Sequence, residues 1–108
     1  MDKTLLYGTL DTLILRTLSE GRLHGYGIAR WIETRSGDRI EVDESSLYPA
    51  LYRLQKKGLL ASEWGRSELD RSAKFYRLTA KGHKALKERT AAWALFVDAV
   101  SDILLTEG

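Results

Sequence analysis

The stretch DESSLYPALYRLQKKG, residues 43–58, decides the fold. Asp43 or Ser45 can cap a helix at its start, and Gly58 followed by two leucines resembles a Schellman ending. With Ser45 as the cap, Pro49 takes the fourth helical position, where a missing N–H costs little. The apolar residues recur at three- and four-residue spacing and form one side of this helix: Leu47, Ala50, Leu51 and Leu54.

The opposite side of this helix carries hydrogen-bond donors and no carboxylate. Hydroxyl, phenol, guanidinium and ammonium groups donate to base edges and phosphates, so this side has the chemistry that a DNA major groove requires. A competing interpretation is that the two tyrosines only pack, with their hydroxyls in water. The side collects Ser45, Pro49, Tyr52 and Lys56, flanked by Tyr48 and Arg53.

Two further helices precede this stretch. Apolar residues at helical spacing predict a first helix over residues 4–19, apolar on two faces and therefore buried on two faces. Leu5 and Leu15 lie on the side of this helix opposite its main apolar face, where a partner could cover them. A second helix starts at His24-Gly25-Tyr26-Gly27 and stops near Ser36. His24 either binds a phosphate together with the first backbone N–H groups or acts only as a cap.

A hairpin and a long helix follow. Residues 60–64 and 73–78 have strand composition and flank the polar tip 65–72. Thr79 can cap a last helix that runs from Ala80 to about Thr106. This order predicts a mainly α fold with a small two-stranded β-wing, a winged helix-turn-helix. We expect a winged-helix domain over residues 1–78 and a dimerisation helix over residues 79–108.

Positive charge is concentrated in the middle of the chain. The net charge is +2, yet residues 44–82 alone carry eight Lys and Arg against four Asp and Glu. Composition alone favours a solvated surface over a nucleic-acid contact for such a patch, and its position on the fold has to decide between them. Lys74 and Arg77 alternate on the second strand, so only one of them points directly at a DNA backbone. The expected DNA contacts are His24, Gly25, Tyr26, Ser45, Ser46, Tyr48, Pro49, Tyr52, Arg53, Lys56, Arg71, Lys74 and Arg77.

Composition excludes several classes of protein. The 108 residues include no cysteine and two histidines, so no metal site and no cofactor is expected. No nucleophile, base and orienting residue fall at the spacing of a catalytic site, so an enzyme is not expected. The sequence has neither an apolar run of spanning length nor a secretory leader pattern, and we expect a cytoplasmic protein without membrane contact.

The last helix predicts a homodimer. It is about 40 Å long at 1.5 Å per residue, too long for a domain of this size to cover. Apolar residues repeat at seven-residue spacing along it, as in a coiled coil. The expected dimer contacts are Leu86, Trp93, Phe96, Val97, Val100 and Leu104, covered by Leu5 and Leu15 of the other subunit.

Trp93 has two interpretations that the sequence leaves open. It fills the dimer core, or it lines an effector site with Phe96 and with Leu6 or Leu10 of the facing first helix. Two indoles facing each other across a twofold axis can hold a small planar aromatic ligand.

Several motifs together resemble the PadR family of bacterial transcriptional regulators. The resemblance covers nearly the whole chain, and its most specific part is the Ser-Leu-Tyr-Pro-Ala-Leu segment, residues 46–51. The other parts are Leu-Tyr-Gly-Thr-Leu-Asp at 6–11, His-Gly-Tyr-Gly-Ile-Ala at 24–29 and Tyr-Arg-Leu-Thr at 76–79 with Gly82.

This resemblance implies a function. It implies a dimeric repressor of the short subfamily that binds double-stranded DNA at an inverted-repeat operator and releases it when a small molecule binds. The alternative is a winged-helix module that binds another protein. Because the core of a protein interface is depleted of charge, Arg53 and Lys56, with no carboxylate partner expected, favour DNA.

Overall fold

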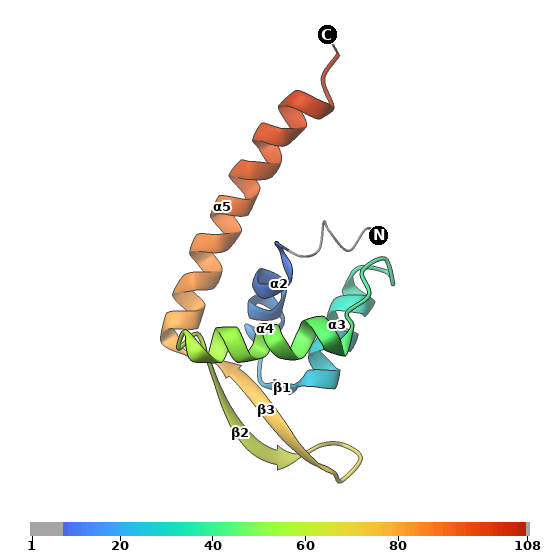
Figure 1. Cartoon of the computed structure of the whole chain (residues 1–108), viewed down its shortest axis with the longest axis vertical. Helices are drawn as coiled ribbons and strands as arrows, with labels where there is room; N and C mark the ends of the chain where they lie inside the picture. The colour runs from blue at the N-terminus through green and yellow to red at the C-terminus, as the bar shows by residue number, and fades with distance from the viewer. Residues whose placement is uncertain (1–7, 108) are drawn as a thin grey trace.

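The winged helix-turn-helix is confirmed in a computed structural model, which describes residues 8–107. Three helices, a small antiparallel sheet and a long final helix follow one another along the chain (Figure 1). The elements are α2 (Leu10–Leu18), β1 (Leu23–His24), α3 (Gly25–Arg35), α4 (Glu44–Lys56), β2 (Leu60–Arg66), β3 (Ser72–Leu78) and α5 (Ala80–Leu104).

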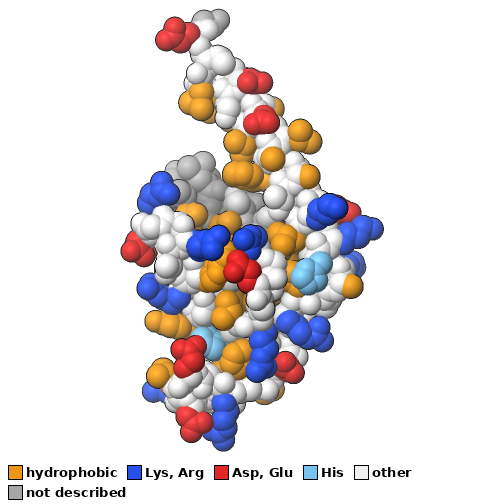
Figure 2. Space-filling view, turned by 180° about the vertical axis from the view of Figure 1, so that it is seen from behind, with side chains coloured by type: hydrophobic (Ala, Val, Ile, Leu, Met, Phe, Trp, Pro, Cys, Tyr) orange, Lys and Arg blue, Asp and Glu red, His pale blue; other side chains and the backbone are white. Residues whose placement is uncertain are grey.

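The two ends of the molecule project from a compact middle. In Figure 1 the β2–β3 hairpin extends away from the three helices, and α5 leaves in the opposite direction. The part of α5 that stands clear shows apolar and acidic side chains but no Lys or Arg in Figure 2. Only Gly82 of α5 is fully buried.

The core lies between α2, α3, α4 and the base of the hairpin. Leu60, Tyr76 and Leu78 bring the hairpin into contact with this core, and Leu86 of α5 packs against its edge. The apolar side of α4 faces inward as the sequence predicts. The largest fully buried apolar side chains are Ile14, Leu15, Ile28, Leu47, Leu51 and Leu54.

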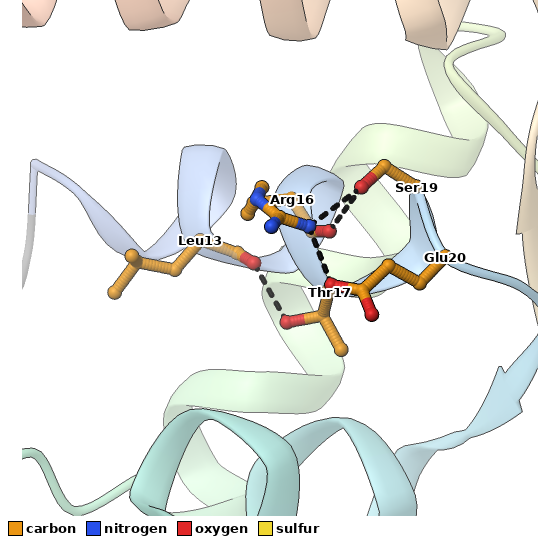
Figure 3. Close-up of polar contacts among 5 residues, drawn as sticks. All are labelled: Leu13, Arg16, Thr17, Ser19 and Glu20. Carbon is orange, nitrogen blue, oxygen red and sulfur yellow. Dashed lines mark hydrogen bonds and ion pairs between the residues drawn. The ribbon is translucent and has the colours of Figure 1, made fainter. Parts of the chain in front are cut away.

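Polar groups at the end of α2 are satisfied locally. Thr17 is 1% exposed, and its hydroxyl donates to the carbonyl of Leu13 at 2.8 Å (Figure 3). Arg16 donates to the carboxylate of Glu20 at 2.7 Å in the same view. A buried hydroxyl with a partner avoids the cost of an unsatisfied donor, so a polar residue is tolerated in the core.

Of the two possible caps, Asp43 and Ser45, helix α4 starts at the earlier one. Asp43 is its N-cap, so Pro49 is the sixth helical residue and not the fourth. Proline lacks the N–H that would donate to the carbonyl of Ser45. Both residues are exposed, so water can satisfy that carbonyl and the helix continues.

The end of α4 confirms the Schellman motif. Gly58 has a φ of +78°, which a residue without a Cβ adopts without strain. The N–H of Gly58 donates to Gln55, and the N–H of Leu59 donates to Leu54 at 3.0 Å. These bonds satisfy the last carbonyls of the helix and turn the chain into β2.

A joint of four residues, Gly58, Leu59, Thr79 and Gly82, ties α4 to α5. Thr79 caps α5 by accepting from the N–H of Gly82 at 3.0 Å, and its hydroxyl donates to the carbonyl of Gly58 at 2.7 Å. Its N–H donates to the carbonyl of Leu59 at 3.1 Å. Gly82 approaches that carbonyl so closely that a Cβ would overlap its oxygen.

Three other details differ from the sequence prediction. Leu23 and His24 form a short strand that pairs with Tyr76 and Phe75, so the sheet has three strands in the order β1-β3-β2. The hairpin strands extend to Arg66 and Ser72, which shortens the tip. The last helix ends at Leu104, two residues before Thr106.

Replacing Gly82 tests the joint. Helix propensity alone predicts that Gly82→Ala stabilises the protein by up to about 1 kcal/mol. The overlap with the backbone of Leu59 instead predicts a lower free energy of unfolding, by about 1–3 kcal/mol or more. Urea denaturation followed by circular dichroism measures the change. A variant as stable as the wild type would show that the two helices are not in tight contact.

Candidate nucleic-acid interface

The outward side of α4 is a continuous exposed surface. Tyr48 is 46% exposed and Tyr52 is 67% exposed, whereas the apolar side of the helix is buried. From residue 45 to residue 56 the helix carries no carboxylate. We call this surface the α4 face; it consists of Ser45, Ser46, Tyr48, Pro49, Tyr52, Arg53 and Lys56, all exposed.

Tyr48 joins the α4 face to the start of α3. A Cβ at Gly25 would lie 2.8 Å from the Tyr48 hydroxyl, so the absence of a side chain at Gly25 makes room for the phenol. Burial raises the pKa of the Tyr76 hydroxyl, and the neighbouring Tyr48 raises it further. Tyr76 therefore stays neutral at physiological pH. Tyr48 thus packs at the point where α3, α4 and β3 meet while half of it stays accessible.

His24 is a helix cap. Its Nδ1 accepts from the N–H of Gly27 at 3.0 Å, and its ring lies edge-on to Phe75 with centroids 5.4 Å apart. The capping role of His24 is therefore confirmed, and its contact with a DNA phosphate stays a prediction. Tyr26, in the first turn of α3, is 70% exposed, and its ring centre lies 6.3 Å from that of His24.

Arg53 has a carboxylate partner, which corrects the sequence prediction. Its Nη2 lies 3.0 Å from Oδ1 of Asp11 on α2, and the Arg53 side chain remains 51% exposed. The two residues are 42 positions apart, so helical spacing within α4 could not reveal the pair. An exposed ion pair contributes at most about 1 kcal/mol, so a phosphate can compete for the guanidinium.

Lys56 has no carboxylate partner within the described part of the chain. Its ammonium lies 5.9 Å from the centre of the Tyr52 ring, close enough for a cation–π interaction. The pair combines a positive charge with a flat phenol at the C-terminal end of the α4 face. Such a pair can contact a phosphate and a sugar or base edge together.

The two basic residues of β3 lie on opposite faces of the wing. Lys74 pairs with Trp64 across the hairpin, and its ammonium is 5.9 Å from the ring of Tyr76. Since Tyr76 is buried in the core that the apolar side of α4 helps to form, this wing face is on the side of α4. Arg77 pairs with Ala61 on the other face, so Lys74 is the one of the two that shares a side with α4. Arg71 is exposed next to the tip.

Trp64 is not among the expected DNA contacts, because its sequence context predicts only the end of a strand. It is 72% exposed, on the same wing face as Lys74. An exposed indole beside a cation suits contact with a nucleic-acid backbone or groove. Trp64 pairs with Lys74 across the hairpin, so only the register of the two strands could have shown that they are neighbours.

The described part of α5 has an unpartnered apolar stripe. Trp93 is 51% exposed and Phe96 is 66% exposed, while Val97 and Val100 are half-buried and Leu104 is exposed. The stripe continues the face from which Leu86 packs against the core. These residues therefore share one face of α5, and their role as dimer contacts stays a prediction.

Two predictions on the first helix need correction. Leu15 is fully buried in the core of its own chain, because α2 is covered on both sides by its own domain, so it cannot cover a partner's helix. Leu10 is 4% exposed for the same reason and has little surface for an effector. Leu5 and Leu6 lie outside the described residues.

Residues 8–107 contain neither a cluster of metal-ligating side chains nor a helix of membrane-spanning character. No group of three or more His, Cys, Asp or Glu residues in this range could hold a metal ion. No helix in the same range is long and apolar enough to span a membrane.

The fold defines the class of protein: a winged helix-turn-helix with one long C-terminal helix. The sequence profile of the transcriptional regulator PadR-like family matches residues 14–88. An uncharacterised protein of Lysinibacillus sphaericus is 32% identical over 90 residues, 83% of each chain. This chain therefore belongs to the PadR-like family of transcriptional regulators.

Solved structures agree with this assignment. A transcriptional regulator from Clostridium thermocellum has a TM-score of 0.85 and 31% identity, covering 94% of this chain and 98% of its own. A PadR family regulator from Eggerthella lenta has a TM-score of 0.82 and 35% identity, covering 96% and 88%. A PadR-like regulator from Bacillus cereus has a TM-score of 0.81 and 30% identity, covering 96% and 99%. These relatives are regulators, which confirms that the protein is not an enzyme.

Proposed function

We propose that the protein is a homodimeric repressor that reads an inverted-repeat operator with the α4 face and works in the cytoplasm. The observation that carries this proposal is the α4 face itself, an exposed helix surface with donors and no carboxylate of its own. Lys74 and Trp64 extend it onto the wing, where a DNA backbone beside the major groove would run. The wing and the first three helices form the DNA-binding unit, residues 1–78, and residues 79–108 form the dimerisation unit.

Dimerisation through α5 is supported by its charge distribution. Its first ten residues, 80–89, carry four Lys and Arg and one Glu, whereas residues 98–107 carry three carboxylates and no cation. An antiparallel pair of α5 helices places the basic half of one beside the acidic half of the other. The same pairing covers the apolar stripe, including Trp93 and Leu104, which water would otherwise contact.

Removal of side chains from the α4 face tests DNA binding. The duplex is the DNA upstream of the protein's own gene, and affinity is measured by fluorescence anisotropy at several salt concentrations. Lys56→Ala is expected to weaken binding to all sequences and to reduce the salt slope by about one. Tyr52→Ala or Arg53→Ala is expected to cost about 1–3 kcal/mol and to blur specificity at one base pair.

Lys84→Ala is the control, since Lys84 is an exposed cation on α5 away from the α4 face. Trp64→Ala extends the series to the wing. Unchanged affinity and salt dependence in all the α4 variants would contradict the DNA-reading role. It would instead favour the alternative, a winged-helix module that binds another protein.

Charged substitutions on α5 test the dimer. The Trp93→Glu/Val100→Glu variant places two carboxylates on the apolar stripe, so it is expected to be monomeric in sedimentation velocity and to lose tight operator binding. Leu95→Glu is the matched control, because Leu95 is 72% exposed and lies on the opposite side of α5. It should remain dimeric. A double variant that sediments like the wild type would rule out the stripe as the interface.

A planar aromatic effector is proposed to bind between the subunits against Trp93 and Phe96. Both rings are more than half exposed within one chain, so they offer apolar surface for stacking. Release of DNA requires that the ligand bind the DNA-free arrangement more tightly. Packing in the dimer core is the competing role for Trp93.

Fluorescence distinguishes these two roles of Trp93. In the Trp31→Phe/Trp64→Phe variant Trp93 is the single tryptophan. Quinoline, a neutral bicyclic probe, is expected to quench its emission, and operator affinity of the wild-type protein should fall in parallel. An intact dimer with neither effect would assign Trp93 to packing alone.

A further inference from the structure

A basic groove lies beside the joint that ties α4 to α5. It is open to solvent, has a volume of about 560 Å³, and is bounded by the end of α4 and the first turns of α5. Leu59, which is buried, and Ala85, which is half-buried, form its apolar part. The lining residues are Lys56, Lys57, Leu59, Lys81, Ala85, Glu88 and Arg89.

The groove concentrates charge of one sign. Four cations face one carboxylate, Glu88, and none of the four forms an ion pair with a described residue. Lys81 is held in place, since its ammonium donates to the carbonyl of Lys57 at 3.1 Å. Four cations beside a single carboxylate repel one another. An anion bound between them lowers this electrostatic repulsion.

The donor set fits a phosphate group. Arg89 offers a planar fork of N–H donors, while each lysine offers a compact ammonium. A phosphate has several oxygens that can accept from such donors at once. The apolar wall formed by Leu59 and Ala85 reduces contact with water on one side and so strengthens these interactions.

We propose that this groove binds a phosphate group at the junction of α4 and α5. Two sources supply this chemistry: the DNA backbone flanking the bases read by α4, and a free compound with a phosphate chain. Lys56 belongs to both the groove and the α4 face, so a free phosphate compound would compete with DNA for its ammonium. Such a ligand would also contact both the reading helix and the dimerisation helix.

The test removes two groove cations that take no part in the α4 face or the joint. Lys57→Ala/Arg89→Ala is compared with Lys84→Ala/Lys87→Ala, which removes the same charge from α5 outside the groove. Binding of sodium tripolyphosphate is measured by isothermal titration calorimetry without DNA. Binding of a random 30-base-pair duplex is measured over a range of salt.

If the natural ligand is a free phosphate compound, the affinity for tripolyphosphate is expected to fall about tenfold or more in the groove variant and to change little in the control. If the ligand is the DNA backbone, the slope of log affinity for the duplex against log salt concentration is expected to fall by about two in the groove variant alone. Either result supports the site and identifies its source. Equal behaviour of the two variants in both assays overturns the proposal. Because the calorimetry contains no DNA, a failure of the proposed DNA-binding function leaves that half of the test intact.

Discussion

The close contact between Gly82 and the carbonyl of Leu59 determines how the winged helix-turn-helix is oriented on α5. A side chain at residue 82 would separate the start of α5 from the end of α4. Thr79 adds four hydrogen bonds at the same place, three through its hydroxyl and one through its N–H. Gly58, which directly precedes Leu59, turns the chain in a left-handed conformation. Each of these contacts has a backbone group on at least one side, and the side chain involved, that of Thr79, is short, so close packing sets the angle between α4 and α5.

A fixed angle at this joint links the two proposed activities. If two α5 helices pair about a twofold axis, the joint sets the distance between the two α4 faces, which an inverted-repeat operator requires to be about 34 Å. A ligand that changes the pairing of α5 would change that distance in the same step. The basic groove lies against the joint, so a phosphate bound there would contact both helices whose relative position matters.

The proposed reading surface combines rigid and adaptable parts. Tyr48 packs over Gly25 and near Tyr76, so it has little freedom to move. Lys56 and Trp64 are exposed and adjust at low cost. Arg53 lies between these cases, because its exposed pair with Asp11 holds the guanidinium in place without neutralising it strongly. A DNA phosphate can therefore take over a side chain that is already in position.

The sequence alone determined what depends on residues close together in the chain. The helical spacing of α4, the Schellman turn at Gly58 and the Thr79 cap each depend on residues within about one turn of backbone, so the sequence alone predicts them. The order of the elements follows from where such local patterns begin and end. Contacts between distant segments needed the tertiary structure. The two-residue strand at Leu23 exists only because β3 offers it a pairing edge, and the Arg53–Asp11 pair forms only because α2 packs beside α4. Leu15 is apolar in either environment, so only the packing of the other helices around α2 decided that its own core, and not a partner, buries it.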